Sequence, residues 1–283
     1  MTQAASIGMR VALALLAFAP AHGRSDAGQI LRKAEAVRNP DLDYAVDFAI
    51  HGVARGARTS ERDATYSMLA RGKDRTVILM RSPSALYGAL VLMAEGQYWM
   101  LLPRASNPWE LSGAQMKNGD IATGNIARVN LTRGFSATVA GEERIEGEAC
   151  WRLELLPVGD DVQFARIAYW VAKKGFLPKR LDQYGSTGTL LKSVRYLDYR
   201  KGALGLRPMR LTIDSMDEWK EASSLTFSNL RKISPPSQAF TPEGMIALRD
   251  AALAAQSAAG AVDVSLERIL GLGGEPLGVK PAR

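Results

Sequence analysis

The sequence predicts a mainly β protein whose strands form an antiparallel sandwich or barrel. Short runs of alternating apolar and polar residues recur at intervals of about 8–12 residues, and glycine-containing turns separate them. No regular alternation of strands and helices appears, which argues against a doubly wound α/β fold. With 47% hydrophobic and 23% charged residues, the 283-residue chain has the composition of an ordinary globular protein.

The first residues have the pattern of a secretory signal peptide. Arg10 precedes the apolar run 11–19, and Ala19-Pro20-Ala21 offers small residues for cleavage. The run is shorter than the roughly 20 apolar residues that span a bilayer. We therefore expect residues 1–21 to be removed on export, leaving no stable membrane span. No cysteine follows the run, so a lipid anchor is not expected.

Periodicity then predicts the elements in order. Apolar residues at helical spacing from 30 to 37 predict a first helix, which Asn39-Pro40 ends. Residues 52–60 are expected as a loop, 119–129 as a short helix and 243–259 as a C-terminal helix. The expected strands are 42–50, 64–70, 75–80, 86–93, 97–102, 109–111, 135–145, 150–156, 166–171, 177–184, 189–199, 208–216 and 223–233. We expect one β domain over 24–248, and over 249–283 the helix end and a flexible tail.

Residues suited to catalysis or metal binding are scarce. Of the two histidines, His22 lies in the cleavage region and His51 stands alone, so a His-based triad or zinc site is not expected. The single cysteine, Cys150, is expected as a buried strand residue. We predict no catalytic residue, no metal and no cofactor, hence no enzyme. Hydrolysis by dispersed carboxylates, such as Asp41 and Asp43, is the weakest alternative left open.

The formal charge of +7 is spread along the chain without a block of like charges, so no nucleic-acid partner is expected. A basic surface can favour anionic lipid, although a solvated basic face is the simpler interpretation.

Apolar and aromatic residues recur along the predicted strands. They have two interpretations, ordinary core packing or the lining of a cavity closed by a helical lid. The ten methionines would suit an adaptable cavity. The candidate residues of an apolar ligand cavity are Tyr44, Val46, Phe48, Tyr66, Met68, Leu92, Trp99, Leu101, Trp109, Leu153, Tyr169 and Val171.

A series of short motifs runs in order through residues 80–248. They are Arg81-Ser82-Pro83, 97–103, Leu111-Ser112, 117–121, 148–155, 169–173, 177–180, Tyr184-Gly185, 190–192, Pro208-Met209 and Phe240-Thr241-Pro242. The series resembles the outer-membrane lipoprotein-sorting family, which is related to the periplasmic carrier LolA. Asn118 and Ile121 depart from the family's turn at 117–121.

The resemblance implies an incomplete antiparallel β-barrel with an N-terminal, a short mid-chain and a C-terminal helix around an apolar interior. It implies a soluble periplasmic carrier that binds the acyl chains of a lipid or lipoprotein and moves it toward the outer membrane. An inner-membrane exporter of the resistance–nodulation–division type, or an outer-membrane acceptor, is then an expected partner. The alternative is a non-enzymatic adaptor or structural protein of an envelope complex.

Overall fold

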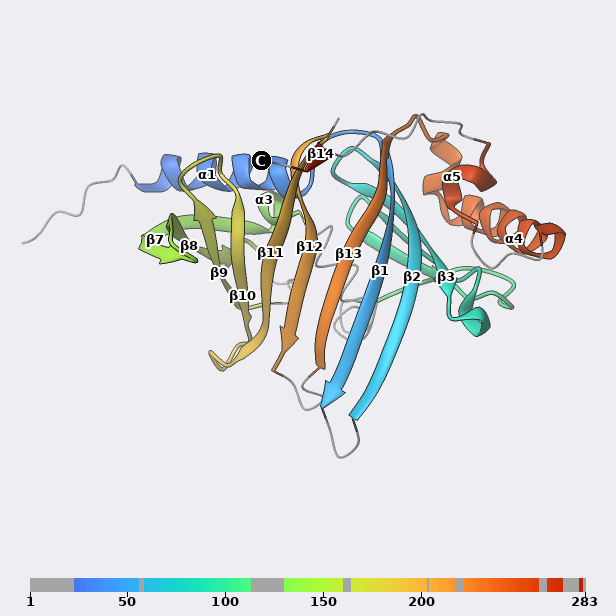
Figure 1. Cartoon of the computed structure of the whole chain (residues 1–283), viewed down its shortest axis with the longest axis horizontal. Coiled ribbons are helices and arrows are strands. Elements are labelled where there is room, and N and C mark those ends of the chain that lie inside the picture. Colours follow the sequence, from blue (N-terminus) through green and yellow to red (C-terminus); the bar gives the residue numbers. More distant parts are fainter. Residues whose placement is uncertain are drawn as a thin grey trace, which may run out of the picture.

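The computed structural model describes residues 23–55, 59–112, 130–159, 164–202, 204–216, 221–259, 264–271 and 280–281. Within these ranges the chain forms one curved antiparallel sheet with a few helices (Figure 1). The mainly β antiparallel fold expected from the sequence is confirmed. The expected signal peptide and the expected helix at 119–129 lie outside the described residues.

Thirteen of the strands in the described residues lie side by side in the order β6-β5-β4-β3-β2-β1-β13-β12-β11-β10-β9-β8-β7, and β14 pairs with β11 off this path. The strands are β1 (Tyr44–Arg55), β2 (Thr59–Arg71), β3 (Arg75–Ser82), β4 (Leu90–Ala94), β5 (Gln97–Leu101), β6 (Trp109–Glu110), β7 (Phe135–Ile145), β8 (Glu148–Pro157), β9 (Arg166–Ala172), β10 (Pro178–Tyr184), β11 (Leu190–Gly202), β12 (Gly205–Ser215), β13 (Glu221–Lys232) and β14 (Lys280–Pro281). The helices are α1 (Gly23–Arg38), α3 (Leu131–Gly134), α4 (Pro242–Ala259) and α5 (Leu266–Ile269), with 3-10 turns η1 (Ser84–Leu86) and η3 (Ser237–Phe240).

Tight turns join several neighbouring strands within the described residues. Glu95 and Gly96 both have positive φ, 55° and 92°, as a two-residue hairpin turn of the right twist requires. Glu146 and Gly147 repeat this pattern with φ of 49° and 83°. The expected hairpin at Glu95-Gly96 is therefore present. Pairing of β1 with β13 joins the start of the sheet to its last long strand.

The structure differs from the predicted elements at the tip of the first hairpin. A loop was expected over 52–60, but β1 runs to Arg55 and β2 begins at Thr59. The two strands keep an unbroken register from Tyr44↔Ala70 to Arg55↔Thr59. Backbone hydrogen bonds of an antiparallel ladder form regardless of side-chain polarity, so the polar residues in this segment do not end the ladder.

The second difference lies in the expected C-terminal tail. Residues 266–269 form α5, and Leu266 is fully buried. Its backbone N–H donates to Ser67 Oγ at 3.0 Å, and Glu267 pairs with Arg231 at 2.5 Å. Four residues carry too little periodicity to reveal a helix, and these contacts come from distant strands. This part of the expected tail is therefore packed against β2 and β13.

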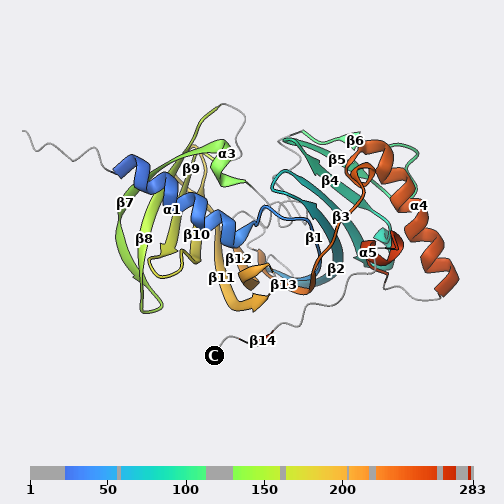
Figure 2. The ribbon, with the colours of Figure 1, turned by 90° about the horizontal axis from the view of Figure 1, so that it is seen from above.

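The two faces of the sheet are covered differently. On the inner face, α1 contacts β7, β10 and β12. On the outer face, α4 contacts β4 and β5, while α5 contacts β2. Figure 2 shows α1 along the half of the sheet that contains β7–β12, with α4 and α5 outside the other half. Each face has its own apolar cluster, which we call the inner cluster and the outer cluster.

The outer face of the β8–β10 region bears a further small cluster around buried Cys150 and Trp170. Charged side chains cover it. The Trp170 indole N–H donates to Glu143 at 2.8 Å, and Arg180 lies over the Trp170 ring. Burial raises the pKa of the Cys150 thiol, which disfavours a reactive thiolate.

Candidate ligand-binding face

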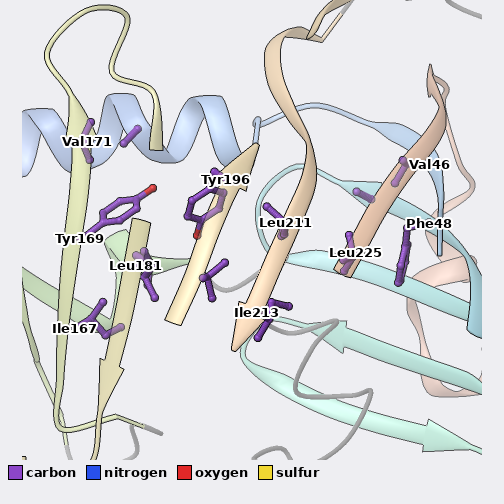
Figure 3. Close-up of a cluster of buried hydrophobic side chains, with 14 of the residues drawn as sticks. Val46, Phe48, Ile167, Tyr169, Val171, Leu181, Tyr196, Leu211, Ile213 and Leu225 are labelled. Atoms are coloured by element: carbon purple, nitrogen blue, oxygen red, sulfur yellow. The ribbon is translucent and has the colours of Figure 1, made fainter. Parts of the chain in front are cut away.

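The inner face is continuous from one edge of the sheet toward the other. Residues directly opposite each other on neighbouring antiparallel strands share a face. The register links apolar side chains through such pairs, which are Tyr66↔Met80, Phe48↔Tyr66, Phe48↔Phe227, Leu211↔Leu225, Tyr196↔Leu211, Leu181↔Val194, Tyr169↔Leu181, Leu153↔Tyr169 and Val139↔Leu153. Figure 3 shows side chains of this cluster projecting from successive strands.

Most of the candidate cavity residues meet on this face. The eight that belong to the inner cluster are Tyr44, Val46, Phe48, Tyr66, Met68, Leu153, Tyr169 and Val171. The rings of Phe48 and Tyr66 stack with centroids 4.7 Å apart. α1 packs on the same cluster through Ala27, Ile30, Leu31 and Ala34. The structure thus brings together two sequence segments, 44–68 and 153–171, that are far apart in the chain.

Three candidate residues lie on the opposite face. Leu92 and Leu101 are fully buried in the outer cluster, and Trp99 packs against it. That cluster includes Met245 and Leu248 of α4. The alternation in β4 and β5 was therefore predicted one residue out of phase, an error that moves every side chain to the other face. These three residues support the packing of α4 and do not line the inner face.

Trp109 belongs to neither cluster. It pairs with Met100 across β5 and β6, and 36% of it is exposed. Because paired residues share a face, Trp109 lies at the edge of the inner face, where the two-residue strand β6 ends the sheet.

The sequence-based prediction missed the residues that do face inward in β4 and β5. Met93 pairs with Tyr98 and Val91 with Met100 around the Glu95-Gly96 turn. Met93 belongs to the inner cluster and Tyr98 packs against it. Every residue of β4 is apolar, so alternation gave no signal for the inward side. Met93 and Met100 could have indicated the inward side, because methionines suit an adaptable apolar surface.

A buried ion pair holds the end of α1 on the inner face. Arg38 Nε donates to Glu35 Oε1 at 2.8 Å, and Arg38 Nη2 donates to Glu35 Oε2 at 2.7 Å. The backbone N–H of Leu131 donates to the same carboxylate at 3.2 Å. Burial acts to lower the pKa of Arg38, but the Glu35 carboxylate, together with Tyr196 and Tyr169, raises this pKa above its usual value, so the guanidinium stays charged. Arg207 Nη2 donates to the Arg38 carbonyl at 3.1 Å at the C-terminus of the helix.

Buried tyrosines lie beneath this pair. The Tyr169 and Tyr196 rings are 6.4 Å apart between β9 and β11. Burial raises the pKa of Tyr196 to about 12, with the Arg38 guanidinium acting in the opposite direction. Burial also raises the pKa of Tyr169 well above its usual value. Among the described residues, the Tyr169 hydroxyl has no hydrogen-bond partner.

The other candidate chemical groups lie away from this face or on the surface. His51 Nδ1 lies 2.8 Å from Asp63 Oδ1, and their side chains are 51% and 80% exposed. No three His, Cys, Asp or Glu side chains in the described ranges are placed to hold a metal ion. Nor does any described helix have the length and hydrophobicity needed to cross a membrane.

The comparisons with known proteins agree with this architecture. A LolA superfamily protein from Nitrosomonas europaea superposes with a TM-score of 0.69 at 28% identity, covering 77% of this chain and 98% of that one. A DUF1329 family protein from Desulfovibrio piger gives a TM-score of 0.67 at 21% identity, with 79% and 99% covered. A proposed outer membrane lipoprotein-sorting protein domain from Vibrio parahaemolyticus gives 0.67 at 15% identity, with 78% and 99% covered.

Among curated proteins, none matches the sequence significantly. A family model described as "uncharacterized protein" matches residues 72–246, more than half of the chain. The matched residues include the strands from β3 to β13 and the first residues of α4. The chain therefore belongs to this family of uncharacterized proteins and has the LolA-like fold of its structural neighbours.

Proposed function

We propose that this protein is a periplasmic carrier that binds the acyl chains of a lipid or lipidated protein on the inner face of its sheet. The observation that supports the proposal best is the continuous apolar inner face. Val91 and Met100 are half-buried near its β6 edge, and Trp109 is exposed there. An acyl chain laid on this surface would bury the exposed apolar area at that edge.

The physical need for such a carrier is clear. Each CH₂ group of an acyl chain contributes about 0.8 kcal/mol when it leaves water, so a long chain does not cross an aqueous space unshielded at a useful rate. Methionines such as Met80, Met93 and Met100 adapt their shape to chains of different length. Binding and release need no catalytic group, and we propose a transport role without enzymatic activity.

We also propose a route for the cargo and the limits of the carrier domain. Residues 1–21 would direct export and be removed, residues 24–248 would form the carrier domain, and residues 249–283 would lie beyond it. The cargo would move toward the outer membrane, taken from an inner-membrane exporter or delivered to an outer-membrane acceptor. Two structural neighbours, named as a LolA superfamily protein and a proposed lipoprotein-sorting domain, support this route.

The test uses the full-length chain, expressed in a bacterium and purified gently from its periplasmic fraction. Native mass spectrometry should show a chain cleaved after Ala21 that carries lipid, and organic extraction should remove that lipid. The emptied protein should then bind a fluorescent fatty acid. A protein that is isolated empty and does not bind the fatty acid would instead support an adaptor role in an envelope complex.

A further inference from the structure

Two methionines of the inner face are partly open to solvent. Met80 pairs with Tyr66 across β2 and β3 and packs against the inner cluster. Met100 pairs with Val91 and stands two residues from Tyr98, which packs against the same cluster. Side chains two residues apart on a strand share a face. Met80 and Met100 are both half-buried, so part of each side chain on this face meets solvent.

The other methionines of the described residues are placed differently. Four of them are at most 9% exposed, and these are Met68, Met93, Met209 and Met245. Met216 is 49% exposed, but it follows the end of β12 and belongs to neither the inner nor the outer cluster. Within the described ranges, Met80 and Met100 are therefore the methionines that combine exposure with a place on the inner face.

The position of these two residues leaves them accessible to small molecules. α1 lies along the half of the sheet that contains β7–β12, whereas β3 and β5, which carry Met80 and Met100, lie in the other half (Figure 2). Met100 also pairs with Trp109 of β6, which is 36% exposed at the edge of the face. A small oxidant dissolved in water can therefore reach both side chains.

The thioether of methionine is the sulfur group that such an oxidant meets. The single cysteine, Cys150, is buried, and burial raises the pKa of its thiol, which keeps the reactive thiolate scarce. A thioether sulfur carries no proton, so its oxidation needs no prior ionisation. Hypochlorous acid removes two electrons from the sulfur and is itself reduced to chloride. One oxygen atom becomes bonded to the sulfur, and one proton is released.

We propose that Met80 and Met100 are an oxidation-sensitive site on the acyl-binding face, and that their conversion to sulfoxides by a hypohalous acid releases acyl cargo. The sulfoxide is polar, and an acyl chain laid against it would remove the S–O group from water without giving it a hydrogen-bond donor. A methionine sulfoxide reductase returns the sulfur to the thioether, so the change is reversible. This inference rests on the proposed carrier function and adds a control of its binding site.

The experiment treats the delipidated full-length protein with a small molar excess of hypochlorous acid. Peptide mass spectrometry should find one added oxygen on Met80 and one on Met100. Affinity for a fluorescent fatty acid should fall about tenfold, as expected when a polar group must be desolvated against the ligand. Incubation with methionine sulfoxide reductases for both sulfoxide epimers and a thiol reductant should restore the affinity.

Variants assign the effect to the two residues. Met80→Leu/Met100→Leu keeps the apolar surface, so it should bind the fatty acid as the unmodified protein does and lose about twofold at most on oxidation. Met216→Leu is the matched control, because it removes an exposed methionine that lies outside both clusters, and it should lose affinity as the unmodified protein does. Fatty acid bound before the treatment should slow the oxidation of Met80 and Met100 severalfold and leave that of Met216 unchanged.

The outcomes separate this inference from the carrier function. Full affinity after oxidation of Met80 and Met100 would overturn the inference and leave the carrier function standing. A loss of affinity that persists in Met80→Leu/Met100→Leu would also overturn it, because the damage would then lie elsewhere. Sulfoxide found on Met216 but on neither Met80 nor Met100 would do the same, since the inner-face methionines would not be accessible. Failure of the untreated protein to bind the fatty acid would overturn the acyl-binding function together with this inference.

Discussion

At the scale of single residues, acyl binding depends on which side chains of β4 and β5 face inward. Met100 and Trp99 are adjacent in the chain but lie on opposite faces of the sheet. Met100 is half-buried beside Trp109 on the inner face, whereas Trp99 packs with the outer cluster that contains α4. A charge introduced at Met100 should therefore have a different effect from a charge introduced at Trp99.

We predict that Met100→Glu weakens fatty-acid binding about tenfold or more, because a carboxylate would have to be desolvated against the acyl chain. Its melting temperature should change little, since the side chain is half-exposed. Trp99→Glu should do the reverse, lowering the melting temperature and preserving the affinity of the folded protein. Binding titration and thermal unfolding of both variants check this. Loss of binding in Trp99→Glu alone would place the ligand on the outer face.

At the scale of elements, α1 is held on the inner face by polar as well as apolar contacts. The Glu35 carboxylate receives two hydrogen bonds from Arg38 and one from the backbone of Leu131 in α3. Arg207 of β12 reaches the C-terminal carbonyl of the helix and lies over the Tyr44 ring. One carboxylate therefore connects α1 to α3, and one guanidinium connects α1 to the sheet.

We predict that Glu35→Leu destabilises the protein by about 3–5 kcal/mol, because it leaves the Arg38 guanidinium buried without its carboxylate. The double variant Glu35→Leu/Arg38→Met should recover most of this loss, since it removes both charges. Urea unfolding followed by circular dichroism measures the three free energies of unfolding. Arg75→Met, which breaks the exposed pair with Glu95, is the control and should change little. Equal losses in the single and double variants would show that the two charges are not coupled.

At the scale of the whole molecule, the sheet is covered by α1 on one face and by α4 and α5 on the other. The helices on the two faces lie over different halves of the sheet. The inner face beneath α1 is therefore deeply buried, while the β6 edge of the same face includes exposed side chains. Tyrosines from β9 and β11 place their hydroxyl groups in the interior beneath α1. Burial there raises the pKa of these hydroxyl groups.

We predict that stability falls at alkaline pH. Burial raises the folded pKa of Tyr196 from 10.0 to about 12, and it raises those of Tyr169 and Tyr199 as well. A raised folded pKa means that the unfolded chain releases its proton first, so this contribution is complete below about pH 10 and is lost as pH rises toward the folded pKa. For Tyr196 the loss amounts to about 2 kcal/mol by pH 12.

Urea unfolding between pH 8 and pH 12, with tyrosinate absorbance at 295 nm, measures this dependence. Tyr196→Phe should flatten the alkaline fall relative to the unmodified protein. A titration of all tyrosines near their usual pKa, with no loss of stability, would contradict the burial of these hydroxyls.

The sequence alone determined the features that depend on neighbouring residues. Alternation identified most strands, and turns such as Glu95-Gly96 specified hairpins, because both arise from local backbone geometry. In β1, Tyr44, Val46 and Phe48 alternate with Ala45 and Asp47, and these three residues lie in the inner cluster. The ordered motifs indicated the LolA-like fold, which the structure and its neighbours bear out.

Only the tertiary structure decided the features that depend on distant contacts. The uniformly apolar β4 had no alternation to reveal its inward side, and α4, more than 140 residues away, covers Leu92 instead. The short helix α5 is held by a hydrogen bond to Ser67 and an ion pair with Arg231, and the sequence of the helix itself does not indicate these contacts. Gln183, Lys192 and Ser215 become neighbours only because β10, β11 and β12 pair in this register. Local sequence specifies backbone shape, but burial is a property of surfaces that meet only when the whole sheet is assembled.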